Sequence, residues 1–110
     1  MTVRAAIHGK GREALVKALT EHEPFTTSGA LKGERWERDS VTNWDLGRLT
    51  DHPAWANAFM IDHLAGINYV VWSYGTPIAW VRKDGAVVKP DVTYSVTTSK
   101  HQGFLYHLGG

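Results

Sequence analysis

The densest group of chemically active side chains lies near the C-terminus, in the stretch YSVTTSKHQ at residues 94–102. Ser99 and Gln102 have the S-x-x-Q spacing of a capping box, in which the serine oxygen and the glutamine side chain satisfy free amides at the start of a helix. The stretch is therefore expected to begin a C-terminal helix. This structural role alone is sufficient to explain Ser99 and Gln102.

The same helix start also suits an anion, because free amides at a helix N-terminus carry partial positive charge. His101 falls at the second helical position, where the helix field disfavours protonation unless an anion is present. A further alternative makes His101 the base of a small phosphoester hydrolase or nuclease, but serine, histidine and acidic residues occur in nearly every sequence. The candidate anion-binding residues are Thr97, Thr98, Ser99, Lys100 and His101.

Residue groups that bind metals or cofactors are missing from the sequence. It contains no cysteine, so neither a disulfide nor a thiolate zinc site can form. The Asp-His pairs at residues 51–52 and 62–63 would lie about 16 Å apart on one helix, too far for one metal ion to bridge. No P-loop, nucleophile-elbow, zinc-hydrolase or dinucleotide-binding motif occurs. We therefore expect no metal, no cofactor and no assigned catalytic residue.

The charge balance argues against a dedicated nucleic-acid-binding protein. The 12 basic and 11 acidic residues leave a formal net charge of +1, whereas such proteins are strongly basic. A nucleic-acid-binding module remains an alternative, because cations that pair with phosphates and rings that stack on bases are both present. Its basic residues would be Arg82, Lys83, Lys89, Lys100 and His101.

The composition also indicates where the protein is found. No stretch approaches the roughly 20 apolar residues that span a membrane, and residues 1–16 lack the apolar run of a secretion signal. The absence of cysteine is typical of a reducing compartment. We expect a cytoplasmic protein that does not contact a membrane.

Two helices that would position these groups are predicted from apolar spacing. Residues 11–22 carry their apolar side chains in one helical stripe, and a proline then prevents the helix from continuing. Residues 53–64 form the second predicted helix, with Thr50 or Asp51 as its cap and Gly66 as its left-handed end.

The strongest strand signals lie between this helix and the C-terminal stretch. Residues 69–74 and 78–82 are rich in β-branched and aromatic side chains, and the Asp-Gly pair at 84–85 favours a hairpin turn. A hairpin closed by Tyr74 and Pro77 would need a hydrogen bond that proline cannot donate. We therefore expect either a wider loop or a cis peptide bond before the proline.

These elements predict one α+β domain over residues 1–110. A small antiparallel β-meander, from residues 68–95, is expected to pack against two or three helices. A further strand is predicted near residues 31–37, and Trp44 and Leu46 are expected to attach the loop of residues 38–50 to the core.

Two sequence blocks resemble the paired blocks of an uncharacterised family of small proteins from actinobacterial phages and related mobile elements. These are YVVWSYGTPIAW at residues 69–80 and YSVTTSKHQ at residues 94–102. The resemblance implies no activity, fold or catalytic residue. It implies a phage-encoded accessory protein made in a bacterial cytoplasm.

The leading hypothesis is therefore a non-enzymatic protein that modulates a host process by binding another macromolecule. Both faces of the predicted strands are apolar, so the sheet is either covered on both sides or meets a partner. The expected partner is a host or phage protein, or a second copy of the chain in a homodimer. The candidate contact residues are Trp72, Tyr74 and Trp80, with a place in the core as the favoured alternative for each.

Overall fold

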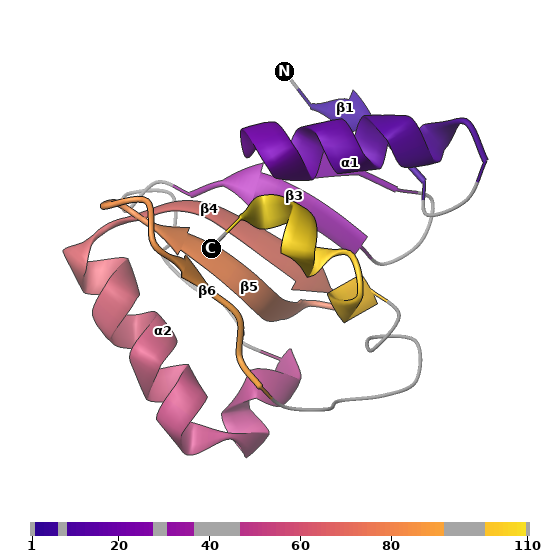
Figure 1. The fold of residues 1–110 in the computed structure, drawn as a ribbon. Helices are drawn as coiled ribbons and strands as arrows, with labels where there is room; N and C mark the ends of the chain where they lie inside the picture. The colour runs from indigo at the N-terminus through magenta and orange to yellow at the C-terminus, as the bar shows by residue number, and fades with distance from the viewer. Residues whose placement is uncertain (1, 7–8, 28–30, 37–46, 92–100, 110) are drawn as a thin grey trace.

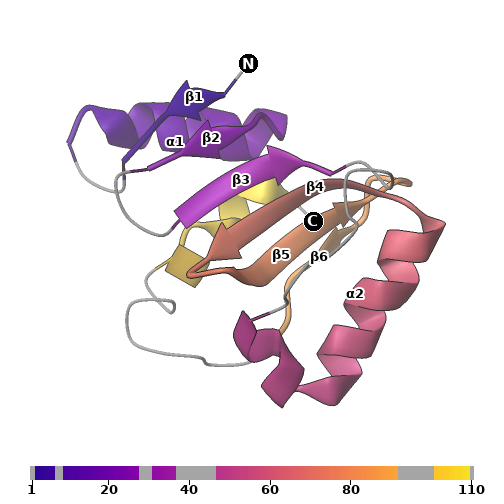
Figure 2. The same ribbon diagram turned by 180° about the vertical axis from the view of Figure 1, so that it is seen from behind.

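The computed structural model describes residues 2–6, 9–27, 31–36, 47–91 and 101–109. They form a six-stranded sheet with helical segments on both faces, which confirms the predicted α+β class (Figures 1 and 2). The described elements are β1 (Val3–Arg4), α1 (Gly11–Glu21), β2 (Phe25–Thr26), β3 (Leu31–Arg35), η2 (Gly47–Asp51), α2 (Pro53–Ala65), β4 (Ile67–Ser73), β5 (Thr76–Arg82), β6 (Val87–Val88) and η3 (Leu105–Leu108), where η marks a 3₁₀ helix.

The sheet is larger than the predicted meander. Its strands lie side by side in the order of the chain, and every neighbouring pair is antiparallel except β1 and β2, which are parallel. Within residues 68–95 the described meander consists of β4, β5 and β6, and β3 matches the further strand predicted near residues 31–37, whereas β1 and β2 were not predicted and extend the sheet beyond β3. β1 and β2 contain two residues each, too few to show an alternating pattern.

The first helix follows its prediction closely. Leu15, Ala18 and Leu19 form its buried stripe, and the charged side chains of the opposite face are exposed. The helix ends at His22, whose left-handed conformation with φ 54° lets the N–H of the following Glu23 donate to the carbonyl of Ala18 at 2.8 Å.

The second helix agrees with its predicted extent, but its N-cap is a different residue. Its N-cap is His52, and no side chain makes a capping hydrogen bond there. The predicted caps Thr50 and Asp51 instead belong to η2, which leads directly into the helix. Gly66, with φ 121°, ends the helix as expected, although outside the left-handed helical region.

The hairpin between β4 and β5 corrects the prediction at residues 74–77. Ser73 and Thr76 are paired, and a register shift after Val71 accommodates the proline. Tyr74 and Gly75 have φ values of 52° and 75°, the arrangement of a two-residue turn that matches strand twist. Neither a wider loop nor a cis peptide bond is needed, and the described residues contain no cis bond.

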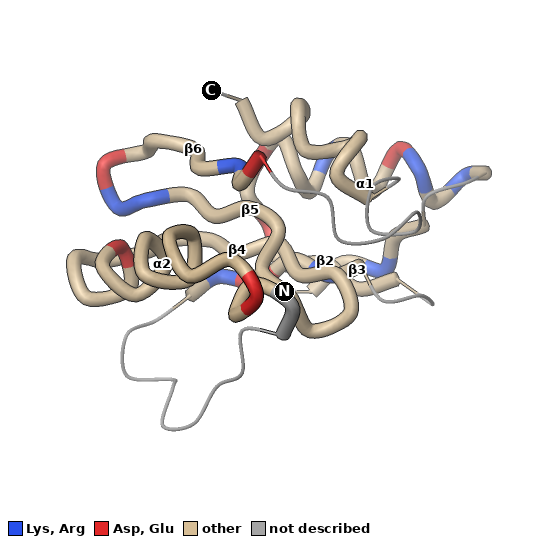
Figure 3. Tube along the Cα trace, turned by 90° about the horizontal axis from the view of Figure 1, so that it is seen from below, with Lys and Arg blue, Asp and Glu red and all other residues tan. Residues whose placement is uncertain are grey.

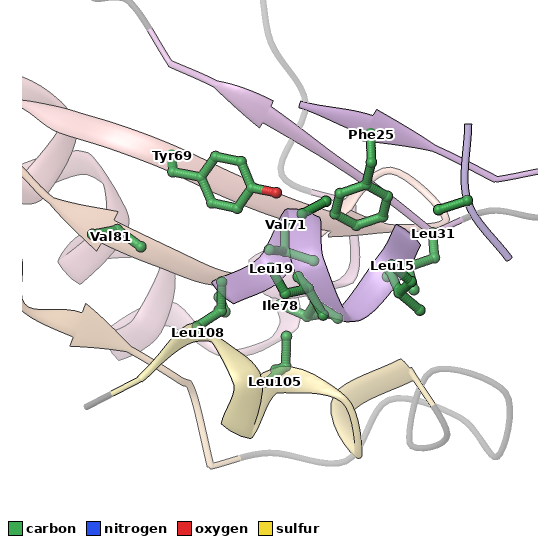
Figure 4. Close-up of a cluster of buried hydrophobic side chains, with 13 residues drawn as sticks. Leu15, Leu19, Phe25, Leu31, Tyr69, Val71, Ile78, Val81, Leu105 and Leu108 are labelled. Atoms are coloured by element: carbon green, nitrogen blue, oxygen red, sulfur yellow. The ribbon is translucent and has the colours of Figure 1, made fainter. Parts of the chain in front are cut away.

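The sheet separates two hydrophobic cores. The α1-side core lies under α1 and η3 (Figure 4), and the α2-side core lies under α2 and η2. The α1-side core comprises Ala5, Leu15, Ala18, Leu19, Phe25, Leu31, Tyr69, Val71, Ile78, Ala79, Val81, Leu105 and Leu108. The α2-side core comprises Trp36, Leu49, Phe59, Ile67, Val70, Trp72 and Trp80.

The C-terminal segment is not one continuous helix. His101 and Gln102 are helical, a turn follows, and η3 then buries Leu105 and Leu108 against the α1-side core. Ser99 lies outside the described residues, as do Trp44 and Leu46, so the capping box and the expected loop attachments stay predictions.

Candidate functional site

Residues that were assigned to separate candidate sites from the sequence meet at the tip of the β4–β5 hairpin. Ser73 ends β4, Thr76 begins β5, and both side chains are almost fully buried. Between them, Tyr74 occupies a left-handed conformation that non-glycine residues rarely adopt. The turn therefore leaves Tyr74 on the surface, while the side chains of Ser73 and Thr76 face the protein interior.

His101 contacts Ser73 across this hairpin. The Oγ of Ser73 and the Nδ1 of His101 are 2.7 Å apart, and the imidazole is only 4% exposed. Burial lowers the pKa of His101, because the charged imidazolium is poorly solvated there. In the tautomer with its proton on Nε2, the neutral ring accepts a hydrogen bond from the serine hydroxyl.

Tyr74 forms the outer layer of this arrangement. Its ring stacks on His101 with centroids 6.0 Å apart and planes inclined by 18°, while the side chain stays 62% exposed. Two predicted candidates thus meet in space, one from the interaction set and one from the anion-binding set. Ser73 was not predicted as a site residue. The sequence pattern that could have indicated it is a single serine at the end of an otherwise apolar strand.

The arrangement has the contact that a nucleophile and its base require, but no access to solvent. A serine that attacks a substrate must reach it, and Ser73 has no exposed surface. What the geometry accomplishes is attachment, since the C-terminal segment is held to the hairpin through a buried polar pair. The remaining anion-binding candidates, Thr97, Thr98, Ser99 and Lys100, lie outside the described residues.

Two of the three predicted contact residues are core residues. Trp80 has no exposed surface and Trp72 is 6% exposed, because α2 and η2 cover the sheet face to which both rings point. Of the two alternatives for these rings, the structure shows the place in the core and not the surface contact. Tyr74 is the member of this set that lies on the surface.

Two indoles of the α2-side core, those of Trp36 and Trp80, are held by polar side chains of α2. The Nε1 of Trp80 donates to Oδ2 of Asp62 at 2.8 Å, and the Nε1 of Trp36 donates to Nδ1 of His63 at 2.9 Å. Arg82 approaches Oδ1 of Asp62 at 3.5 Å. The two most polar groups near the end of α2 therefore face inward.

The outer face of α2 is consequently apolar. Met60, Ile61 and Leu64 are 41%, 57% and 60% exposed. No charged residue occurs in the helix before Asp62. Sequence reasoning missed this surface, although a helix that is apolar all round is the expected signal of a second contact face.

The basic residues do not form a concentrated patch in the described part of the chain. Arg82 lies 3.8 Å from Asp84 as well as near Asp62. Positive and negative segments follow one another around the turn between β5 and β6 (Figure 3). Within the described ranges, no group of three or more histidine or acidic residues could hold a metal ion.

The comparisons with known proteins identify a family. Residues 46–107 match the model of a family of unknown function (DUF8033). The match covers more than half of the chain, so the protein belongs to this family. It includes α2, the β4–β5 hairpin and His101, whereas α1 and the first three strands precede it.

No curated protein and no solved structure matches the chain. Membership of an uncharacterised family agrees with the expectation, whereas an origin in actinobacterial phages stays a prediction. Of the described helices, none has the length and apolar character needed to cross a membrane.

Proposed function

We propose that this protein is a phage-encoded accessory protein of the bacterial cytoplasm that acts by binding a host or phage protein without catalysing a reaction. The observation that carries the proposal is the exposure of Met60, Ile61 and Leu64 on the outer face of α2. Contiguous exposed apolar side chains are typical of protein contact surfaces. The contact surface is therefore the outer face of α2.

The character of this face favours a protein over a nucleic acid. Phosphate recognition needs cations, and residues 53–61 contain none. The nearest carboxylate, that of Asp62, is engaged by Trp80 and Arg82. When an uncharged apolar surface of this kind is covered by a partner protein, no charged group of α2 is buried without a counterpart.

The spacing of the exposed residues favours a groove in the partner. Asn57, Met60, Ile61 and Leu64 follow the i, i+3, i+4, i+7 pattern with which a helix enters an apolar groove. α2 has 13 residues and is about 20 Å long. Two such helices laid side by side bury less than the roughly 1,600 Å² of a standard stable interface, so a homodimer through α2 is the weaker alternative.

The test compares binding by matched surface variants. The purified protein serves as bait in a lysate of the bacterial host, and the captured protein is then purified and titrated against wild type, Ile61→Glu and Leu64→Glu. Lys17→Glu, on the exposed face of α1, is the control. Each α2 variant should cost about 2 kcal/mol or more of binding free energy, as central contact residues do, and the control should cost little.

The fold of each variant is verified by circular dichroism and by its urea midpoint. Binding that both α2 variants retain at wild-type affinity would refute the assignment of the surface. A partner that releases both variants but retains Lys17→Glu supports it.

The weaker alternative is phosphoester hydrolysis: the 2.7 Å contact between Ser73 and His101 pairs a hydroxyl with a base, but the burial of Ser73 requires the hairpin tip to open before a substrate reaches it. A neutral histidine beside a hydroxyl can act as its base. The test is turnover of bis-p-nitrophenyl phosphate by wild type, Ser73→Ala and His101→Ala. No turnover by the wild type, or equal turnover by all three, would rule this function out.

A further inference from the structure

A pocket distant from the hairpin tip lies where α1, β3 and β4 meet. It encloses about 410 Å³, within the range of small-molecule sites. Its lining residues are Glu21, His22, Arg35, Trp36, Asn68 and Tyr69.

The pocket contains opposite charges that do not neutralise each other. Arg35 and Glu21 are both exposed, and neither takes part in an ion pair within the described part of the chain. Glu21 is the last residue of α1, where the helix carbonyls add negative potential. One side of the pocket therefore favours a cation, while Arg35 provides a fork that suits a carboxylate.

His22 supplies the accessible ring of the pocket and is held in a fixed position, whereas the rings of Tyr69 and Trp36 are buried in the two cores on opposite faces of the sheet. The ring of His22 stacks on Tyr69, with centroids 5.6 Å apart, and its Nε2 lies 2.9 Å from the carbonyl oxygen of Leu108. Because a carbonyl only accepts, Nε2 is the donor in this contact. The hydroxyl of Tyr69 donates to the carbonyl oxygen of Glu23 at 2.6 Å, and its ring lies over the α1-facing side of the sheet (Figure 4).

Asn68 supplies neutral polar atoms at the same pocket. It is exposed, and its side-chain amide makes no hydrogen bond to any described residue. An amide offers both donors and an acceptor. It therefore suits a ligand that presents both kinds of group.

We propose that this pocket binds a small zwitterion of amino-acid size, with its carboxylate on Arg35, its ammonium group towards Glu21 and the end of α1, and its side chain against the half-buried ring of His22. A ligand with only one charge would leave either the arginine or the glutamate without a counterpart. A ligand without charge would use neither.

The test is a titration followed by two-dimensional amide NMR with three related probes. L-phenylalanine carries both charges, N-acetyl-L-phenylalanine lacks the ammonium group, and L-phenylalanine amide lacks the carboxylate. L-phenylalanine should produce saturable shifts at the amides of residues 22, 35 and 68. Each modified probe should bind about tenfold more weakly, which corresponds to about 1.4 kcal/mol.

Variants separate the pocket from non-specific binding. Arg35→Met and Glu21→Gln should each weaken L-phenylalanine binding about tenfold, whereas Lys17→Met and Glu13→Gln, exposed on α1 outside this pocket, should leave it unchanged. The proposal is wrong if L-phenylalanine causes no saturable shift at millimolar concentration. It is also wrong if all three probes bind alike, or if the pocket variants bind as tightly as the controls.

Discussion

The two faces of the sheet are stabilised in different ways. On the α1 side, the core is mainly aliphatic, and the polar tips of Tyr69 and His22 bond to main-chain carbonyls. On the α2 side, the core is mainly aromatic, and two indoles bond to side chains of the covering helix. The polar contacts of the α1 side therefore depend on the path of the backbone, whereas those of the α2 side depend on the side chains of Asp62 and His63.

This difference explains why α2 has an apolar outer face. A helix on a protein surface usually directs its polar residues to water, but Asp62 and His63 are used inside as acceptors for indole N–H groups. Ile61 and Leu64, which flank them in sequence, then point outward. The rotation of α2 about its own axis therefore has two consequences: its polar side chains anchor it to the core, and its apolar side chains form the outer face.

The largest expected effect comes from removing the ring at the centre of the α2 side. Phe59 is fully buried and meets Trp80 edge to face with centroids 5.0 Å apart. Phe59→Ala should lower the free energy of unfolding by about 3–5 kcal/mol, from lost transfer free energy and the remaining cavity. Met60→Ala, the adjacent and largely exposed residue, is the control and should cost less than about 1 kcal/mol. Urea denaturation measures both, and equal losses would contradict the assigned orientation of α2.

The next effect tests the close packing of the α1 side. A Cβ placed on Gly33 would collide with the Tyr69 hydroxyl and with the ring of Phe25. Gly33→Ala should therefore destabilise the protein by about 1–3 kcal/mol, the usual cost of overpacking. Tyr69→Phe also removes the hydrogen bond to the Glu23 carbonyl, but in the Gly33→Ala background it relieves a collision as well, so it should cost less stability there than in the wild type. Unchanged stability of Gly33→Ala would show that Tyr69 does not cross above this position.

The elements that the sequence predicted well are those whose signals are local. The stripe of α1 and the β-branched strands β4 and β5 are encoded in consecutive residues, so their approximate limits were predictable. β1 and β2 were not, because two residues are too few to show a strand pattern, and β1 pairs with a strand that lies beyond α1 in the chain. The contact of Ser73 with His101 spans 28 positions and depends on how the C-terminal segment returns to the sheet. The orientation of α2 was equally hidden, since it depends on which indoles need an acceptor.

Two tryptophans that face the same side allow a matched comparison of buried donors. The Nε1 of Trp80 has Asp62 as its acceptor, whereas the buried Nε1 of Trp72 has no hydrogen-bond partner among the described residues. Both substitutions by phenylalanine remove similar ring volume. Trp80→Phe also removes a charge-assisted hydrogen bond, so it should be more destabilising than Trp72→Phe by about 1–3 kcal/mol.

Thermal and urea unfolding of the two variants measure this difference. The control is Trp80→Phe combined with Asp62→Ala, which removes both partners of the bond. If the two single variants are equally stable, the indole bond to Asp62 does not anchor the helix.

The smallest expected effect is a pH dependence at the hairpin tip. Burial lowers the pKa of His101 in the folded protein, whereas the unfolded chain should titrate near the ordinary value of about 6.5. Below that pH the unfolded state binds the proton more readily, so the free energy of unfolding should decrease as the pH falls through about 6.5 towards the folded-state pKa. Above that range both states are neutral, and this contribution stays constant.

The measurement is urea unfolding of wild type and His101→Gln at about pH 7.5 and about pH 5, on either side of the ordinary histidine pKa. The glutamine variant should lose less stability on acidification than the wild type, because it lacks the titrating ring. His107→Gln, a half-buried histidine in η3, is the control for the removal of a histidine near the C-terminus. An identical pH dependence in wild type and His101→Gln would mean that the ring next to Ser73 is solvated well enough to accept a proton without cost. The contact between Ser73 and His101 would then make no contribution to the pH dependence of stability.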